Sequence, residues 1–88
     1  MAVKTYGYDL VANVRTLVVP ASVGVQHVCI HNHEHNQNHE IFIGGSDVTL
    51  TNGMHARATE TSIIQLLPMD ELYAIANQNS NLRILVVK

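Results

Sequence analysis

The sequence predicts a small all-β protein, a β-sandwich or jelly-roll-like fold of seven to eight short antiparallel strands. The core has to be built from Val, Ile and Leu, which favour strands, because the 88 residues include one Phe, three Tyr and no Trp. Turn-forming runs recur at intervals of roughly 8–12 residues, and no segment has a convincing helical period. We expect an N-terminal arm over residues 1–8 and a single β-sandwich domain over residues 9–88.

Turn residues bound the expected strands. Pro20 ends the first strand and Pro68 halts a later one, because proline interrupts the backbone pairing of a sheet interior. The run 33–39 has no apolar residue, and we expect it to form an exposed hairpin tip. The expected strands are residues 9–19, 25–33, 40–43, 63–67, 72–76 and 82–87, with short extended pieces at 48–51 and 53–58.

The stretch 41–53 is expected to be a rigid connector around which the chain is organised. It contains a Gly-Gly corner at 44–45 and an Asn-Gly pair at 52–53, which is typical of tight hairpin turns. We expect the corner glycines to adopt backbone angles that a Cβ would penalise. Asp47 is expected to accept hydrogen bonds from nearby backbone amides.

Two strands lack the alternation of apolar and polar residues that a half-exposed sheet shows. Residues 63–67 and 82–87 are apolar at almost every position. The pattern predicts that both faces of these strands are buried, and in so thin a sandwich the second face is most simply covered by another subunit. We therefore expect a homo-oligomer.

Composition excludes several classes of function. Five Lys and Arg against seven Asp and Glu give a net charge of −2, so nucleic-acid binding is not expected. Cys29 is the only cysteine, which rules out a disulfide within the chain and fits synthesis in a reducing compartment. No apolar run approaches the roughly 20 residues that span a bilayer. We expect neither a membrane nor a nucleic-acid partner.

The run His31 to His39 is the most distinctive candidate for chemistry. His31, His33 and His35 alternate, so on a strand they would share one face with about 6.6 Å between neighbours, and two such imidazoles can reach one metal ion. The residues that could complete such a site are His39, Glu34 and Glu40. The spacing lacks the second fixed ligand pair of recognised metal sites. We favour a solvated tip and predict no metal.

Cys29 is the candidate nucleophile, with His27 and His31 two residues away on the same face. A reactive thiol needs an exposed, electropositive setting, whereas Cys29 lies between Val28 and Ile30 on an expected strand. We predict no catalytic residues, no cofactor and no enzymatic activity.

Five motifs resemble small structural proteins of tailed bacteriophages, and together they span roughly residues 25–87. The matching segments are Val28–Asn32, Ile41–Thr49, Thr51–Gly53, Asp70–Ala76 and Leu82–Leu85. The resemblance implies a virion component with a β-sandwich fold, foremost a head decoration (cement) protein that binds the major capsid protein, often as a trimer. It would be made in the host cytoplasm and reside on the capsid surface.

The chain departs from that pattern in two places. Residues 57–62 stand where a Pro-Gly turn is usual, and the segment after Asn32 is unusually long and rich in His. Two alternatives to decoration remain open. The first is an adaptor at the neck, tail or fibre, and the second is a cupin-like metal protein that adds His55 or Glu60 to the histidine run.

Overall fold

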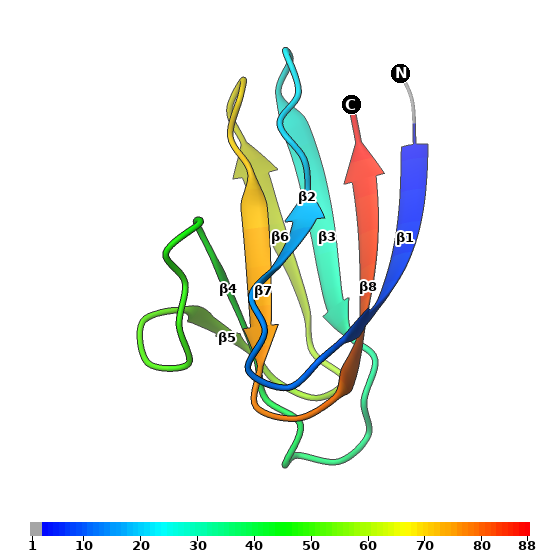
Figure 1. Ribbon diagram of the computed structural model, residues 1–88. Coiled ribbons are helices and arrows are strands. Elements are labelled where there is room, and N and C mark those ends of the chain that lie inside the picture. Colours follow the sequence, from blue (N-terminus) through cyan, green and yellow to red (C-terminus); the bar gives the residue numbers. More distant parts are fainter. Residues whose placement is uncertain (1–2) are drawn as a thin grey trace.

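Two four-stranded antiparallel sheets pack face to face in the computed structural model, which describes residues 3–88 (Figure 1). One sheet has the strand order β1-β8-β3-β6 and the other β2-β7-β4-β5. The strands are β1 (Val3–Leu10), β2 (Thr16–Val19), β3 (Gln26–Asn32), β4 (Ile41–Gly44), β5 (Met54–Ala56), β6 (Thr61–Leu66), β7 (Leu72–Ala76) and β8 (Ser80–Val87). The predicted all-β class is confirmed. The described part of the chain has no helix, and so none that could cross a membrane.

The chain crosses from one sheet to the other at every connection except β4–β5. This winding is that of a jelly roll. It places the β2–β3 and β6–β7 connections at the end of the sandwich where β1 starts and β8 ends (Figure 1). The β1–β2, β3–β4 and β7–β8 connections lie at the other end.

The core lies between the two sheets and is aliphatic. In β8, Leu82, Ile84 and Val86 are at most 1% exposed, while the residues between them point outward. In β3, the same alternation of inward and outward side chains buries Val28 and Ile30 completely. Complete burial of one such side chain contributes about 1.5–3 kcal/mol. Buried and exposed positions therefore alternate in β8. The apolar residues of its second face are not fully covered by any part of residues 3–88.

The structure corrects the expected arm over residues 1–8. Val3–Leu10 form β1, which pairs with β8 along its whole length, from Val3 opposite Val87 to Leu10 opposite Ser80. The segment looked patternless because it lies at a sheet edge, where only Leu10 is fully buried. Residues 1 and 2 lie outside the described part of the chain.

The single strand expected at 9–19 is instead the end of β1, a turn and β2. Asn13 has a φ of 63°, and its amide donates to the Ala76 carbonyl at 2.7 Å. The chain has to turn here because β1 and β2 belong to different sheets. The run 33–39 is likewise a connection between sheets, from β3 to β4, and not a hairpin tip.

The glycines of the 44–53 connection leave room for neighbouring side chains where a Cβ would be crowded. Their backbone angles are not the reason for glycine, which corrects the expectation for this stretch. No glycine in residues 3–88 has a positive φ. A Cβ on Gly44 would lie 3.1 Å from Val48 Cγ2, so the glycine lets Val48 pack into the turn. Asn52, not Asp47, organises the loop, because its Oδ1 accepts the Thr49 amide at 2.7 Å. Residues 48–51 are consequently a turn and not an extended piece.

Gly53→Ala is expected to destabilise the protein by about 1–3 kcal/mol, the usual cost of overpacking. The added Cβ would lie 2.7 Å from both Phe42 Cβ and Val48 Cγ2. Gly24→Ala is the matched control, since nothing lies within 4 Å of its Cβ position. Urea denaturation measures both. Equal stabilities for the two variants would contradict the packing role of Gly53.

Tyr8→Phe is expected to lower stability at neutral pH by about 1 kcal/mol, because the Tyr8 hydroxyl donates to the Val18 carbonyl at 2.8 Å and joins the two sheets. Tyr73→Phe, which loses only an exposed bond to Glu71, is the control and should cost less. Urea denaturation of the three proteins makes the comparison.

The same variant tests the titration of Tyr8. Burial, and secondarily the neighbouring Tyr6, raises the pKa of Tyr8 above 10.0. The folded state then holds the Tyr8 proton more tightly than the unfolded state does. The stability that comes from the protonated Tyr8 hydroxyl is therefore lost as pH rises above 10.0. Tyr8→Phe should show a smaller loss over that range. An identical alkaline decline in both proteins would contradict the assignment.

Candidate interaction surface

The side of the β1-β8-β3-β6 sheet that faces away from the core carries an apolar surface, which we call the outer face. Strand register places its side chains in two adjacent rows across all four strands. The first row is Thr5, Leu85, Cys29 and Ile63, and the second is Val3, Val87, His27 and Gln65.

The apolar side chains of the outer face are open to solvent. Ile63 is 76% exposed, Val3 62% and Leu85 36%, and Cys29 and Val87 are partly exposed. They come from all four strands and lie side by side, so they form one continuous patch and not scattered residues. Contiguous exposed apolar surface of this kind marks an interaction site.

Polar side chains bound this patch on one side. The next row contains Arg83 and His31. Arg83 Nε donates to Asn81 Oδ1 at 2.8 Å, and Asn81 Nδ2 donates to Asp9 Oδ1 at 2.8 Å. His31 Nδ1 lies 3.0 Å from Thr61 Oγ1. These polar groups satisfy one another, so the boundary of the patch is a rigid polar rim.

The outward side of the other sheet is better covered by its own side chains. The Phe42 and His55 rings stack at a centroid distance of 4.7 Å, and Ile75 is only 9% exposed. The buried His55 Nε2 makes no hydrogen bond and lies 4.0 Å from Glu40 Oε1. This side therefore offers less uncovered apolar surface than the outer face.

A further apolar surface lies at the end of the sandwich that carries the β2–β3 and β6–β7 connections. Val23 is 90% exposed, Met69 65% and Leu67 58%. The two connections are tied together, since the Met69 amide donates to the Ser22 carbonyl at 2.7 Å. Met69 lies in a turn, has a φ of 69° and is exposed on the surface.

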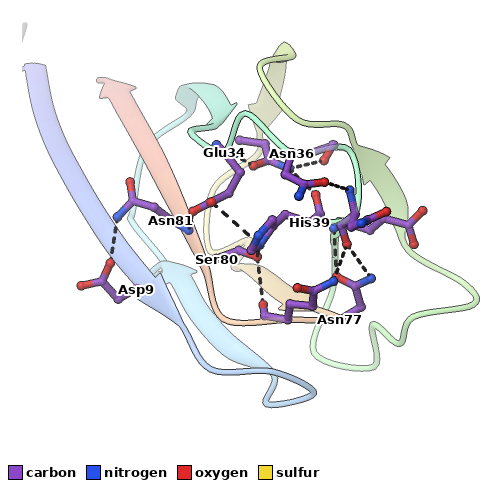
Figure 2. Close-up of polar contacts among 12 residues, drawn as sticks. Asp9, Glu34, Asn36, His39, Asn77, Ser80 and Asn81 are labelled. Carbon is purple, nitrogen blue, oxygen red and sulfur yellow. Dashed lines mark hydrogen bonds and ion pairs between the residues drawn. The ribbon is translucent and has the colours of Figure 1, made fainter.

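The run His31 to His39 is fixed against the β7–β8 connection and the first residues of β8, as Figure 2 shows. Glu34 Oε2 accepts the Asn81 amide at 2.6 Å, and His39 Nδ1 lies 3.1 Å from Ser80 Oγ. Asn77 donates to the Asn38 carbonyl at 3.0 Å. Length and polarity suggested a free tip, whereas this network makes the run part of the domain.

Asn32 anchors the start of that run and was not singled out by sequence reasoning. It is fully buried, and its Nδ2 donates to the carbonyls of His39 at 3.1 Å and Ala56 at 2.9 Å. Its Oδ1 accepts the Glu34 amide at 3.2 Å. One side chain thus joins β3, the histidine run and β5. Asn32 is the last residue of β3, and the alternation of that strand directs its side chain into the core.

The strand geometry assumed for His31, His33 and His35 is wrong for the last two, because β3 ends at Asn32 and both lie in the β3–β4 connection. His31 and His33 have a ring-centroid distance of 5.5 Å, and His33 and His35 one of 6.2 Å. The His39 ring contacts Ser80 Oγ through its Nδ1. Residues 3–88 contain no group of three or more His, Cys, Asp or Glu side chains arranged to hold a metal ion. The absence of metal chemistry stays a prediction.

Cys29 lies in the middle of the outer face, opposite Leu85 on one side and Ile63 on the other. His27 and His31 share this face, as the strand pattern predicted. The described residues enclose no pocket in which a substrate could be held beside the thiol. The geometry of this surface suits contact with a broad partner.

Comparisons with known proteins bear on the fold. No protein-family model matches the chain, and no curated protein matches it significantly. Among solved structures, the chain is similar to a protein of the Bacillus endospore appendages, described as a novel family of disulfide-linked pili. The TM-score is 0.57 at 7% identity, over 97% of this chain and 84% of that one. At this identity, the similarity shows the fold alone.

A second solved structure is the SPP1 Dit (gp 19.1) protein, described as a paradigm of the hub adsorption apparatus in phages that infect Gram-positive bacteria. The TM-score is 0.48 at 15% identity, over 97% of this chain. The chain spans 48% of the length of that protein.

Asn32→Ala is expected to cost about 2–4 kcal/mol of stability, because two carbonyls lose their donor in a buried position. Asn36→Ala is the matched control, since Asn36 accepts only an exposed amide, that of Asn38. Chemical denaturation measures both. A loss below 1 kcal/mol for Asn32→Ala would contradict the anchoring role.

Proposed function

We propose that this chain is a bacteriophage virion structural protein, and specifically a capsid decoration (cement) protein that binds the outer surface of the head. The observation that carries the proposal is the outer face, an apolar surface on four strands that the described residues 3–88 leave uncovered. The motifs spanning residues 25–87 support the assignment to phage structural proteins. The proposed partner is the major capsid protein.

The proposed mechanism is contact area and not chemistry. A paired sheet presents Ile63, Leu85 and Val3 on a backbone that is already ordered, so binding costs mainly side-chain entropy. Binding at the junctions between capsid subunits stabilises the assembled shell over the free subunits by mass action. Repetition of the contact over the shell multiplies a modest free energy per copy.

The direct test is location and copy number in purified virions that contain the chain. Heads and tails are separated and the chain is quantified in each by mass spectrometry. Decoration predicts that the chain stays with the heads in numbers that scale with the capsid subunits. A few copies with the tails would favour the adaptor alternative, and absence from the particle would contradict a virion role.

Leu85→Asn is expected to weaken binding to heads that lack the chain by about tenfold or more, because the amide would be buried without a partner at about 1–3 kcal/mol. Leu85 lies on the central strand β8 and is 36% exposed, so the fold should be retained. Met54→Asn, on the other sheet and 50% exposed, is the matched control. Sedimentation with heads measures both. Equal binding would contradict contact through the outer face.

A further inference from the structure

Three of the four sheet edges carry features that oppose pairing with another strand. The edge strand β1 contains Lys4. Strand β2 has a register shift between Leu17 and Val19 and is followed by Pro20, and β5 has only three residues. Charges, bulges, proline and short length are the usual means by which proteins keep sheet edges from associating.

The fourth edge, β6, has none of these features. Its six residues, Thr61–Leu66, include no charged residue, no proline and no glycine. Its register with β3 runs without a shift from Thr61 to Leu66. A regular, uncharged strand of high β-propensity at an edge is able to accept another strand.

The hydrogen-bond pattern shows which backbone groups of β6 are free. The Asn32 amide donates to the Glu60 carbonyl at 3.2 Å, and the β3–β6 register places these two residues opposite each other, so Asn32 stands at a hydrogen-bonding position of the ladder. Such positions alternate along antiparallel strands, so Ser62, Ile64 and Leu66 bond to β3. The amides and carbonyls of Thr61, Ile63 and Gln65 therefore point away from the sheet.

Apolar side chains flank this free edge on both sides of the sheet. Ile63 is 76% exposed on the outer face, and Ile64 packs against the core but is only partly buried. In Figure 1 the short β5 lies away from most of β6. A strand added to the edge would cover Ile63 and Ile64 together.

We propose that β6 pairs antiparallel with β6 of a second copy across a two-fold axis near Ile63. The free amides and carbonyls of one copy then meet those of the other, with Ile63 opposite Ile63 and Thr61 opposite Gln65. No like charges face each other, since β6 carries none. A second copy fits because the edge is complementary to itself in hydrogen bonding and in apolar contact.

The pair would have a continuous eight-stranded sheet, from two copies of a four-stranded one. It would join the two outer faces into one surface of twice the area, because Ile63 lies on both the edge and the outer face. This proposal does not depend on the capsid function. It also differs from the trimer that the family resemblance implies, so mass alone separates the two.

The test is the solution mass of the purified chain over a range of concentrations, measured by sedimentation equilibrium. Ile63→Pro removes an amide that points to the free edge and leaves the β3 bonds of Ser62 and Ile64 in place. We expect a dimer of the 9.7 kDa wild-type chain and a folded monomer for Ile63→Pro. Gln65→Pro, which removes the next outward amide, should also be monomeric and serves if Ile63→Pro does not fold.

Two controls keep the test specific. Ile63→Thr keeps the amide and the β-branched shape and should remain dimeric. Thr5→Pro places the same change on the β1 edge of the same sheet and should also remain dimeric. The Thr5 amide points outward, because the bond from the His33 amide to the Asn81 carbonyl fixes which β8 residues bond to β3 and which bond to β1.

Circular dichroism confirms that each variant is folded. A monomeric wild type at every concentration or a trimer would overturn the proposal, as would a dimer that survives both β6 proline variants. Loss of the dimer in Thr5→Pro alone would also overturn it and would indicate pairing through β1.

Discussion

The two-layer arrangement is the constraint on which the rest of the structure depends. With only two sheets, each strand can bury the side chains of one face, and the core takes every second residue of β3 and β8. Apolar residues at the alternate positions, such as Leu85 and Ile63, have no layer above them. Part of the excess of apolar residues in the sequence therefore lies on the outer face, and a further part lies in the connections at the end of the sandwich.

The jelly-roll winding explains why polar residues are as important to the fold as the aliphatic core. A chain that changes sheet at nearly every connection leaves backbone carbonyls at the ends of the sandwich without strand partners. Asn32 and the network around His39 supply donors there, and Tyr8 joins the sheets through the Val18 carbonyl. The histidine run, which looked like a site for chemistry, is fixed by these same bonds. We interpret its polar side chains mainly as structural.

The sequence predicted the parts of the fold that local chemistry determines. Residues 72–76 form a strand with the expected bounds, because Pro68 and a polar run enclose a short apolar segment. The strand β1 could not be foreseen, because it is ordered by pairing with β8, whose residues lie 70 or more positions away in the sequence. Sheet crossings and the uncovered state of Ile63 also depend on tertiary arrangement. The runs that are apolar at almost every position predicted burial of both faces, whereas in the structure one face buries its side chains and the other leaves Leu85 and Ile63 exposed.

Thiol labelling of Cys29 tests the central claim, that the outer face is a contact surface, most directly. Cys29 is the only cysteine and lies between Leu85 and Ile63 in the middle of that face, so the native chain needs no substitution. Labelling rates would be compared between the free chain and the chain in purified virions. If a partner covers the outer face, labelling is expected to be strongly slowed in the assembled particle. Equal rates in the two states would show that the outer face stays open to solvent and is not the contact surface.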